Sequence, residues 1–175
     1  SSGRPLPPIT YTSLGVQLAH FSADGQPTWT IDRPVFGTYN WANDLAVDQS
    51  GNAYVLGNCY GFPSFSDEST LGTYFSKVSR EGSILWSRTL RHDHFGANVN
   101  ERSLGIAVDE NNKVYVLNSF DGSDYRILLN QQCVDSSFAG QPNPFLTTWD
   151  SLGNLLQILP SRAYRFFSDG VQRVS

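Results

Sequence analysis

The chain has 175 residues, which is enough for a single domain with a sizeable hydrophobic core. Its net charge of -4 argues against nucleic acid or an anionic membrane surface as the main partner. No apolar run approaches the roughly eighteen residues that span a bilayer, so we expect no membrane insertion.

The first segments of the chain predict an extended lead-in followed by a β-hairpin. Residues 1–8 are rich in serine and proline, and the remainder, 9–175, predicts one domain. Within it, residues 9–32 hold two apolar runs on either side of the turn Ser22-Ala23-Asp24-Gly25. Apolar runs that flank a glycine-containing turn are typical of β-hairpins.

Residues 43–90 form the unit around which the rest of the chain is organised. They hold two hairpins in succession, with turns that close at Gly51 and Gly82. Both hairpins return in residues 103–160, and the first returns once more in residues 163–175. The hairpin before the central unit copies its second hairpin, because in both a tryptophan follows the turn glycine by four residues.

The spacing of the turns indicates a repeat of about sixty residues. First-hairpin turns close, in steps of 61 and 58 residues, at Gly51, Asn112 and Gly170. Second-hairpin turns close, in steps of 57 and 71 residues, at Gly25, Gly82 and Gly153. The longest step contains residues 118–144, which predict an irregular connection. Four short antiparallel strands repeated in tandem are the sequence form of a β-propeller blade. We therefore predict an all-β fold of β-propeller-type four-stranded antiparallel blades, in about three repeats.

The two ends of the chain each predict half of a blade. The hairpins 9–32 and 163–175 together have the strands of one blade, so we expect one blade to be shared between the termini. Three blades do not close a ring, since propellers have about four to eight. Two alternatives stay open. Either the chain is part of a longer propeller, or copies combine into an oligomeric one, for example two chains that make about six blades.

Three motifs follow one another in the central unit. They are Val-Asp-x-x-Gly-Asn-x-Tyr-Val-x-Gly at 47–57, Gly-Phe-Pro at 61–63 and Tyr-Phe-x-Lys-Val-x-x-x-Gly-x-x-Leu-Trp-Ser at 74–87. This order resembles the bacterial and archaeal propeller-type repeat called the SBBP repeat. Residues 45–55 alone show a weaker similarity to NHL-type propeller repeats. The first resemblance implies a secreted or cell-surface β-propeller with no single activity attached. In the second unit it is limited to the hairpins, because Thr148 stands where the lysine is expected.

Two short polar clusters are candidate metal sites. His92 and His94 alternate in an extended segment, so both imidazoles point the same way and are candidate ligands for one metal. Asp121 and Asp124 offer two carboxylates in a glycine-containing loop and are candidates for Ca²⁺ or another ligand, although the spacing of a calcium loop is absent. For both clusters a loop or turn without a ligand is the favoured interpretation. We therefore expect no cofactor, with Ca²⁺ or another divalent metal as the alternative.

Aromatic residues and cysteines are the remaining candidates. Tyr39 and Trp41 precede a predicted strand and are the aromatic residues best placed to face a ligand. Cys59 and Cys133 lie in comparable regions of successive units, so a disulfide between adjacent blades and two buried thiols are the two interpretations. Three further aromatic residues recur at strand positions and predict packing between blades: Trp29, Trp86 and Trp149.

The function predicted first is a non-enzymatic binding or assembly module outside the cell or on its surface, whose partners are other proteins or copies of itself. Stacked blades expose loops on two faces, and an incomplete stack also leaves unpaired strand edges. A carbohydrate-binding, lectin-like propeller is the first alternative. A metal-dependent propeller of the lactonase or hydrolase type is the second, and the apolar first strands of both units weaken it.

Overall fold

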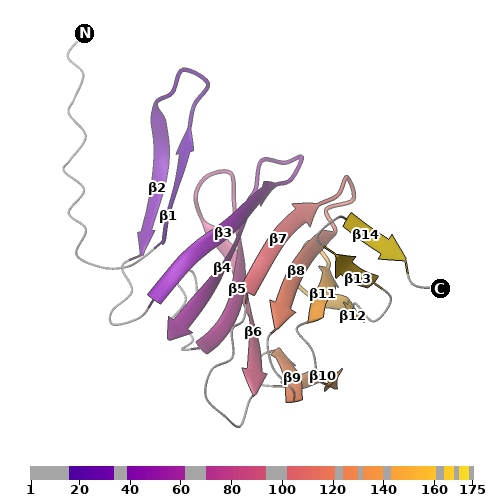
Figure 1. Ribbon diagram of the computed structural model, residues 1–175. Coiled ribbons are helices and arrows are strands. Elements are labelled where there is room, and N and C mark those ends of the chain that lie inside the picture. The colour runs from indigo at the N-terminus through magenta and orange to yellow at the C-terminus, as the bar shows by residue number, and fades with distance from the viewer. Residues whose placement is uncertain are drawn as a thin grey trace.

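The computed structural model of this chain describes residues 16–33, 39–61, 70–93, 102–120, 124–129, 132–139, 143–160, 164–167 and 170–173. These residues form fourteen β-strands, and none of them is helical (Figure 1). In chain order the strands are β1 (Val16–Phe21), β2 (Pro27–Arg33), β3 (Tyr39–Val47), β4 (Ala53–Gly61), β5 (Thr70–Val78), β6 (Ile84–Asp93), β7 (Arg102–Val108), β8 (Val114–Phe120), β9 (Asp124–Leu129), β10 (Gln132–Ala139), β11 (Asn143–Trp149), β12 (Leu155–Pro160), β13 (Tyr164–Phe167) and β14 (Gly170–Arg173). The paired strands are antiparallel, and the all-β prediction is confirmed.

Two complete four-stranded units lie side by side in the middle of the molecule (Figure 1). In the first unit the neighbouring strands are β3, β4, β5 and β6, and in the second they are β7, β8, β11 and β12. Positions in the two units correspond when they are counted from the turns, so that Asp48 matches Asp109 and Gly82 matches Gly153. The predicted four-stranded antiparallel organisation is therefore present in both units.

The turns of these hairpins share one form, which their sequence specifies. The Asp48 carboxylate accepts hydrogen bonds of 3.0 and 2.9 Å from the backbone N–H groups two and four residues further on. Asp109 and Asp150 accept the equivalent pair of bonds at their own turns. Near the end of the turn, Gly51 has a φ of 82° and its counterpart Asn112 has a φ of 59°, a region that glycine and asparagine tolerate best. An aspartate and a glycine or asparagine at this spacing thus fix the hairpin turn.

An additional hairpin interrupts the second unit. The sequence predicts an irregular connection over residues 118–144, and this prediction is wrong for the described part, because β9 and β10 form a hairpin there. β9 pairs with β6 at the edge of the first unit, so the first sheet has six strands in the order β10-β9-β6-β5-β4-β3. The insertion explains why the step from Gly82 to Gly153 is longer than the other steps.

The hydrophobic core lies between the two units. Successive side chains of a strand point to opposite faces of the sheet. The side chains of Tyr54, Leu56 and Phe75 in the first unit point towards the second unit. Val116 and Trp149 of the second unit point towards the first, and all five side chains are 0% exposed. We call these surfaces the forward face of the first unit and the back face of the second unit. The rings of Phe75 and Trp149 meet edge to face, with centroids 4.7 Å apart.

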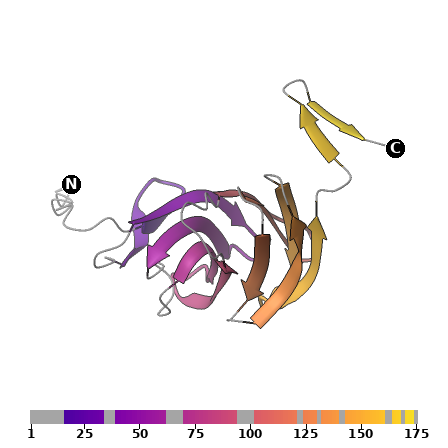
Figure 2. The same ribbon diagram turned by 60° about the horizontal axis from the view of Figure 1, so that its bottom comes forward.

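A two-stranded hairpin flanks the complete units at each end of the described chain. β1–β2 packs on the back face of the first unit, where Val16 joins a second core cluster with Val55 and Tyr74. β13–β14 is a separate sheet that stands away from the complete units (Figure 2). It is a hairpin, as predicted, but only two residues separate its strands, whereas five separate β3 from β4.

Candidate functional site

A tryptophan on the last strand of one unit contacts a turn of the next unit. The Trp86 indole N–H in β6 donates to the Ser151 carbonyl oxygen at 3.1 Å. The Trp29 indole N–H in β2 donates to the Arg80 carbonyl oxygen at 2.8 Å. Because Arg80 and Ser151 occupy the same turn position, one kind of contact joins β1–β2 to the first unit and the first unit to the second. The predicted packing of these two tryptophans between units is confirmed.

A glycine makes room for each indole. A Cβ added at Gly82 would lie 2.8 Å from the Trp29 ring, and one at Gly153 would lie 3.0 Å from the Trp86 ring. The two glycines have φ angles of 86° and 78°, so the turn also needs them for its backbone. We call this glycine and the carbonyl two residues before it the turn site. The glycine leaves room for the planar indole ring, and the carbonyl oxygen accepts a hydrogen bond from the indole N–H.

Arg88 adds to the contact between the units. Its Nε–H donates to the Gly153 carbonyl oxygen at 2.7 Å, and its Nη2–H donates to the Leu152 carbonyl oxygen at 3.2 Å. The guanidinium carbon lies 5.4 Å from the centroid of the Trp86 ring, within the range of a cation–π interaction. Arg88 and Trp86 therefore hold the same turn of the second unit together.

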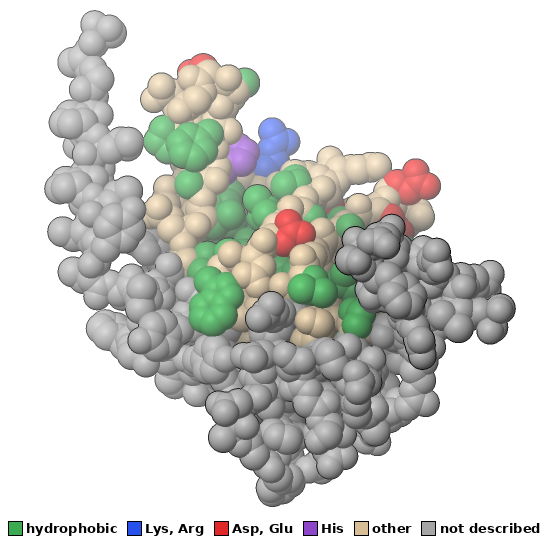
Figure 3. Space-filling model, viewed as in Figure 1, with side chains coloured by type: hydrophobic (Ala, Val, Ile, Leu, Met, Phe, Trp, Pro, Cys, Tyr) green, Lys and Arg blue, Asp and Glu red, His purple; other side chains and the backbone are tan. Residues whose placement is uncertain are grey.

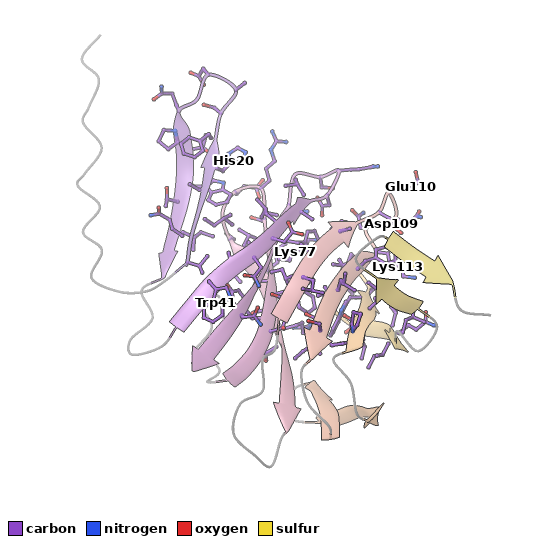
Figure 4. The ribbon with its side chains drawn as sticks, in the orientation of Figure 1. His20, Trp41, Lys77, Asp109, Glu110 and Lys113 are labelled. Carbon is purple, nitrogen blue, oxygen red and sulfur yellow. The ribbon has the colours of Figure 1, made fainter. Side chains whose placement is uncertain are left out.

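A buried ion pair lies on the forward face of the first unit. The Lys77 ammonium in β5 is 3.4 Å from Asp48 Oδ2, and only 9% and 2% of the two side chains are exposed (Figure 4). The ammonium lies 4.9 Å from the Tyr54 ring centroid, and the Tyr54 hydroxyl donates to Asp48 at 3.3 Å. Burial alone would raise the pKa of Asp48, but the hydrogen bonds from Asn52 and the charge of Lys77 outweigh it and lower that pKa. Burial raises the pKa of the Tyr54 hydroxyl.

The second unit repeats this arrangement with a lysine from a different position. The Tyr115 hydroxyl donates to Asp109 Oδ2 at 3.1 Å, and the Lys113 ammonium lies 5.3 Å from the Tyr115 ring centroid (Figure 4). Lys113 belongs to the turn, whereas Thr148 in β11 takes the place of Lys77. The hydrogen bond from the Lys113 backbone N–H lowers the pKa of Asp109. The forward face of the second unit thus keeps the tyrosine, the aspartate and a lysine of the first.

Acid is expected to destabilise the fold through the turn aspartates. The pKa values of Asp48, Asp109 and Asp150 are lower in the folded chain than their ordinary values, so the unfolded chain binds protons more readily. Their stabilisation is complete above the unfolded pKa of about 4, and it is lost as the pH falls through the lower folded pKa values. Urea denaturation between about pH 6 and pH 2 measures this loss, which we expect to be shallower in Asp48→Asn. The same urea midpoint at both ends of that range would contradict the assignment.

A hydrogen-bonded polar cluster joins the units near the ends of β4 and β7 that are remote from the turns. The Asn58 Oδ1 in β4 accepts hydrogen bonds from the Ser103 N–H at 3.1 Å and from the Ser103 hydroxyl at 2.8 Å. It also accepts one from the Asn43 side-chain amide at 2.7 Å. Next to it, Asp44 Oδ2 accepts a hydrogen bond from the Ile106 N–H at 2.9 Å. These bonds hold β3 and β4 of the first unit against β7 of the second.

Asn118 is a buried amide in the strand beside this cluster. It pairs with Ser103 between β8 and β7 and is 0% exposed. Neither its Nδ2 nor its Oδ1 has a hydrogen-bond partner among the described residues. A buried polar group without a partner costs about 1–3 kcal/mol.

Leucine at position 118 is therefore expected to raise the free energy of unfolding. For Asn118→Leu we expect a gain of about 1–2 kcal/mol, because the buried amide is removed. The same change at Asn58 is the matched control, and it is expected to cost about 2–3 kcal/mol, because it leaves the Ser103 N–H and hydroxyl without their acceptor. Urea denaturation compares the two variants. If Asn118→Leu and Asn58→Leu lowered the free energy of unfolding by the same amount, this account of the cluster would be contradicted.

The predicted aromatic pair lies on β3, the first strand of the first unit. Tyr39 pairs with Tyr60 of β4 at the start of the strand, and Trp41 is 43% exposed at its lower end (Figure 4). Trp41 therefore presents an accessible indole, while its backbone carbonyl packs closely over Gly57. The expected ligand-facing role of the pair stays a prediction.

The structure places two of the four candidate metal ligands. His92 lies in β6 opposite Ile127 of β9, so the expectation of a connecting loop is wrong for this residue. Asp124 begins β9, and His94 and Asp121 lie outside the described residues. Within the described ranges, no three His, Cys, Asp or Glu side chains are grouped so that they could hold a metal ion. The same ranges contain no helix long and apolar enough to cross a membrane.

Cys59 and Cys133 lie in one sheet with three strands between them. A single row of paired residues runs from Cys59 through Gly72, Arg91 and Leu128 to Cys133. At about 4.8 Å for each of the four steps, the two Cα atoms are roughly 19 Å apart. A disulfide needs Cα atoms within about 7 Å of each other. Of the two interpretations, the disulfide is therefore wrong, because Cys133 belongs to the inserted hairpin, which extends the first sheet.

Comparisons with family models and with curated proteins give no relative for this chain. No model of a known protein family matches it, and a search of curated proteins finds no match either. The resemblance of the central unit to the SBBP repeat therefore stays a prediction that rests on the motifs of residues 47–87.

Proposed function

We propose that this chain is a β-propeller-type repeat module that acts by binding protein, either copies of itself or other partners, and not by catalysis. Two four-stranded units that stack face to face and repeat their turn contacts support a propeller-type arrangement. The contacts between the units are made by apolar faces, by indole and guanidinium N–H groups on turn carbonyl oxygens, and by side-chain oxygens that accept from strand N–H groups.

The observation that carries the proposal is the forward face of the second unit. Its Tyr115 and Leu117 match Tyr54 and Leu56 of the first unit, which are 0% exposed because the second unit covers them. In the second unit both positions are only half-buried. Leu159, on the last strand of the same face, is 41% exposed.

A partially exposed sheet face of this composition favours a protein partner. Burying one leucine side chain fully contributes about 1.5–3 kcal/mol, and a second sheet stacks on such a face at a separation of about 10 Å. Apolar surface of this kind on a folded protein marks an interaction site. The forward face of the second unit therefore resembles the forward face of the first unit in composition. The first unit's face is covered by the second unit, whereas no further unit covers the second unit's face among the described residues.

We also propose that the protein is located outside the cell or on its surface. The support is the resemblance of the central unit to repeats of exported proteins. Protease treatment of intact cells that express the full protein tests this, and complete protection of the chain would overturn it.

Light scattering of wild type and Leu159→Asp tests the binding proposal. We expect the mass of wild type to rise above 19.4 kDa with concentration, because the forward face of the second unit finds a partner. The exposed position of Leu159 lets aspartate enter without loss of the fold, so the variant should remain at 19.4 kDa with an unchanged circular dichroism spectrum. A wild-type mass of 19.4 kDa at every concentration up to about 1 mM would overturn binding between copies of the chain.

A further inference from the structure

The forward faces of the two units differ at one position, which carries a charge only in the first unit. Lys77 of β5 pairs with Tyr54 of β4, and its ammonium lies 3.4 Å from Asp48 Oδ2. Thr148 of β11 pairs with Tyr115 of β8 in the same way, so the two positions correspond. The second unit therefore keeps the tyrosine and the aspartate but has a short neutral side chain in place of the lysine.

The Asp109 carboxylate of the second unit has acceptor capacity that its counterpart uses. Asp48 Oδ2 accepts from the Asn52 side-chain amide at 2.9 Å and pairs with Lys77, in addition to its bond with a tyrosine. Asp109 Oδ2 accepts from the Tyr115 hydroxyl at 3.1 Å and from no other described residue. Because an ionised carboxylate oxygen accepts more than one hydrogen bond, Asp109 Oδ2 has room for a further donor.

Thr148 brings a buried hydroxyl to the same place. The residue is 2% exposed, and its Oγ1 has no hydrogen-bond partner in the part of the chain that the structure describes. Its side chain lies on the same face as that of Tyr115, because directly opposite residues of an antiparallel pair share a face. Buried hydroxyl groups are in the large majority hydrogen-bonded, so this one indicates a group that binds here.

The row of side chains around Thr148 is smaller than the equivalent row of the first unit. Gln157 pairs with Thr148 as Trp86 pairs with Lys77. A glutamine thus replaces an indole, and a threonine replaces a lysine. Gln157 is exposed, so this part of the forward face is reached from solvent, and its side-chain oxygen is one more acceptor.

The charge around this place favours a cation. At the two turns of the first unit and at position 77, two acidic and two basic residues cancel each other: Asp48, Glu81, Lys77 and Arg80. At the equivalent positions of the second unit, acidic residues outnumber basic ones by three to one: Asp109, Glu110, Asp150 and Lys113. Figure 3 shows acidic side chains at the surface of the β7–β8 turn, where Figure 4 places Asp109 and Glu110. Such an excess of one sign attracts the opposite charge.

Lys113 takes over only one of the two contacts of Lys77. Its ammonium lies 5.3 Å from the Tyr115 ring centroid, as the Lys77 ammonium lies near the ring of its own tyrosine. Its bond with Asp109 is made by the backbone N–H, at 2.9 Å. A second ammonium on Asp109 Oδ2 therefore does not replace a contact of Lys113.

We infer that the forward face of the second unit binds a lysine side chain of its protein partner at Asp109, Tyr115 and Thr148, which we call the lysine site. The inference rests on the proposed function and names the group that the partner contributes. The ammonium pairs with Asp109 Oδ2, as Lys77 pairs with Asp48, and donates to the Thr148 hydroxyl. The aliphatic stem of the lysine packs on the half-buried Tyr115.

Titration of the full chain with N-acetyl-lysine methylamide, followed by NMR, tests the lysine site. We expect saturable shifts of the Tyr115 and Thr148 amide signals, with a dissociation constant of about 1–10 mM for a single lysine. N-acetyl-norleucine methylamide has a similar stem without the ammonium, and we expect it to leave these signals in place. Asp109→Asn should weaken lysine binding about tenfold or more, because it removes the charge but keeps an oxygen for the turn.

Asp150→Asn is the matched control. Asp150 accepts the equivalent backbone bonds in the other turn of the second unit, at 2.9 and 2.8 Å, and its second oxygen accepts from the Asn154 side chain. We therefore expect this change to leave lysine binding as it is in wild type. Equal weakening by both changes, or equal shifts with the lysine and norleucine derivatives, would overturn the inference.

Thr148→Val separates a binding role of the hydroxyl from a structural one. In the free chain we expect a urea midpoint equal to or above that of wild type, because a buried hydroxyl without a described partner is removed. The dissociation constant for the lysine derivative should rise about tenfold, because the ammonium loses an acceptor. A lower urea midpoint together with unchanged lysine binding would overturn the placement of Thr148 in the lysine site.

The outcomes separate this inference from the proposed function. If the chain associates but the lysine derivative gives no saturable shift up to about 100 mM, the inference is overturned and the proposed function stands. If the derivative binds at the lysine site while wild type stays at 19.4 kDa, the lysine site stands and binding between copies of the chain is overturned.

Discussion

Phe75→Ala is expected to lower the free energy of unfolding by about 3–5 kcal/mol. The Phe75 side chain is 0% exposed and lies between two tryptophans, with its ring centroid 5.5 Å from that of Trp86 and 4.7 Å from that of Trp149. The substitution removes apolar surface from the core between the units and leaves a cavity that two rigid rings cannot fill. Urea denaturation followed by tryptophan fluorescence measures the loss.

Leu85→Ala is the matched control for this experiment. Leu85 also lies in the first unit, on β6, but it is 53% exposed, so we expect a change within about 0.5 kcal/mol. Losses of equal size in the two variants would contradict a core placed between the two units.

Gly57→Ala is expected to cost about 3 kcal/mol or more, although it adds a single methyl group. A Cβ at Gly57 would lie 2.2 Å from the Trp41 carbonyl oxygen and 2.7 Å from the Tyr74 ring and hydroxyl. The first contact is with the backbone of the neighbouring strand β3, and the second is with a side chain that is 0% exposed. Neither group has room to move unless the sheet opens, so we expect the destabilisation to lie at the upper end of the range for overpacked cores.

Gly105→Ala controls for the effect of adding a methyl group to a strand. A Cβ at Gly105 would meet only Asp44 Oδ2, at 3.5 Å, which is an ordinary contact. We expect this variant to stay within about 1 kcal/mol of wild type in thermal unfolding. If Gly57→Ala proved as stable as Gly105→Ala, β3, β4 and β5 would not approach each other as closely as the structure has them.

The turn residues account for the part of the fold that the sequence predicts. An aspartate that accepts hydrogen bonds from its own turn, followed by a glycine with positive φ, acts within five residues. Such local chemistry identifies hairpins at Gly51 and Gly153, and at Gly82 the Ser79 hydroxyl accepts the equivalent hydrogen bonds. The repeat of those hairpins predicts four-stranded units. The structure confirms both units.

The inserted hairpin and the separation of the cysteines depend on pairing between distant segments. β9 pairs with β6 through partners such as Leu90 and Leu129, and this pairing moves Cys133 into the first sheet. A strand adds where the fold offers an open edge, and the periodicity of its own sequence does not reveal that edge. Sequence reasoning therefore assigned Cys133 to the second unit and was wrong.

The polar cluster between the units was also missed. Asn58 and Ser103 are polar residues near strand ends, where a solvent-facing position is the ordinary expectation. Their positions in the repeat are the sequence feature that indicates a buried location. Asn58 continues the row of Tyr54 and Leu56 on a face that the next unit covers, so a polar residue there needs a partner from that unit.

Hydrogen exchange of the β12 amides tests most directly the claim that the forward face of the second unit binds protein. We expect protection of residues 155–159 in wild type to increase with protein concentration, because a second copy covers the forward face of the second unit, and we expect Leu159→Asp to abolish this increase. Protection that is the same at every concentration, in wild type and in the variant alike, would contradict the account.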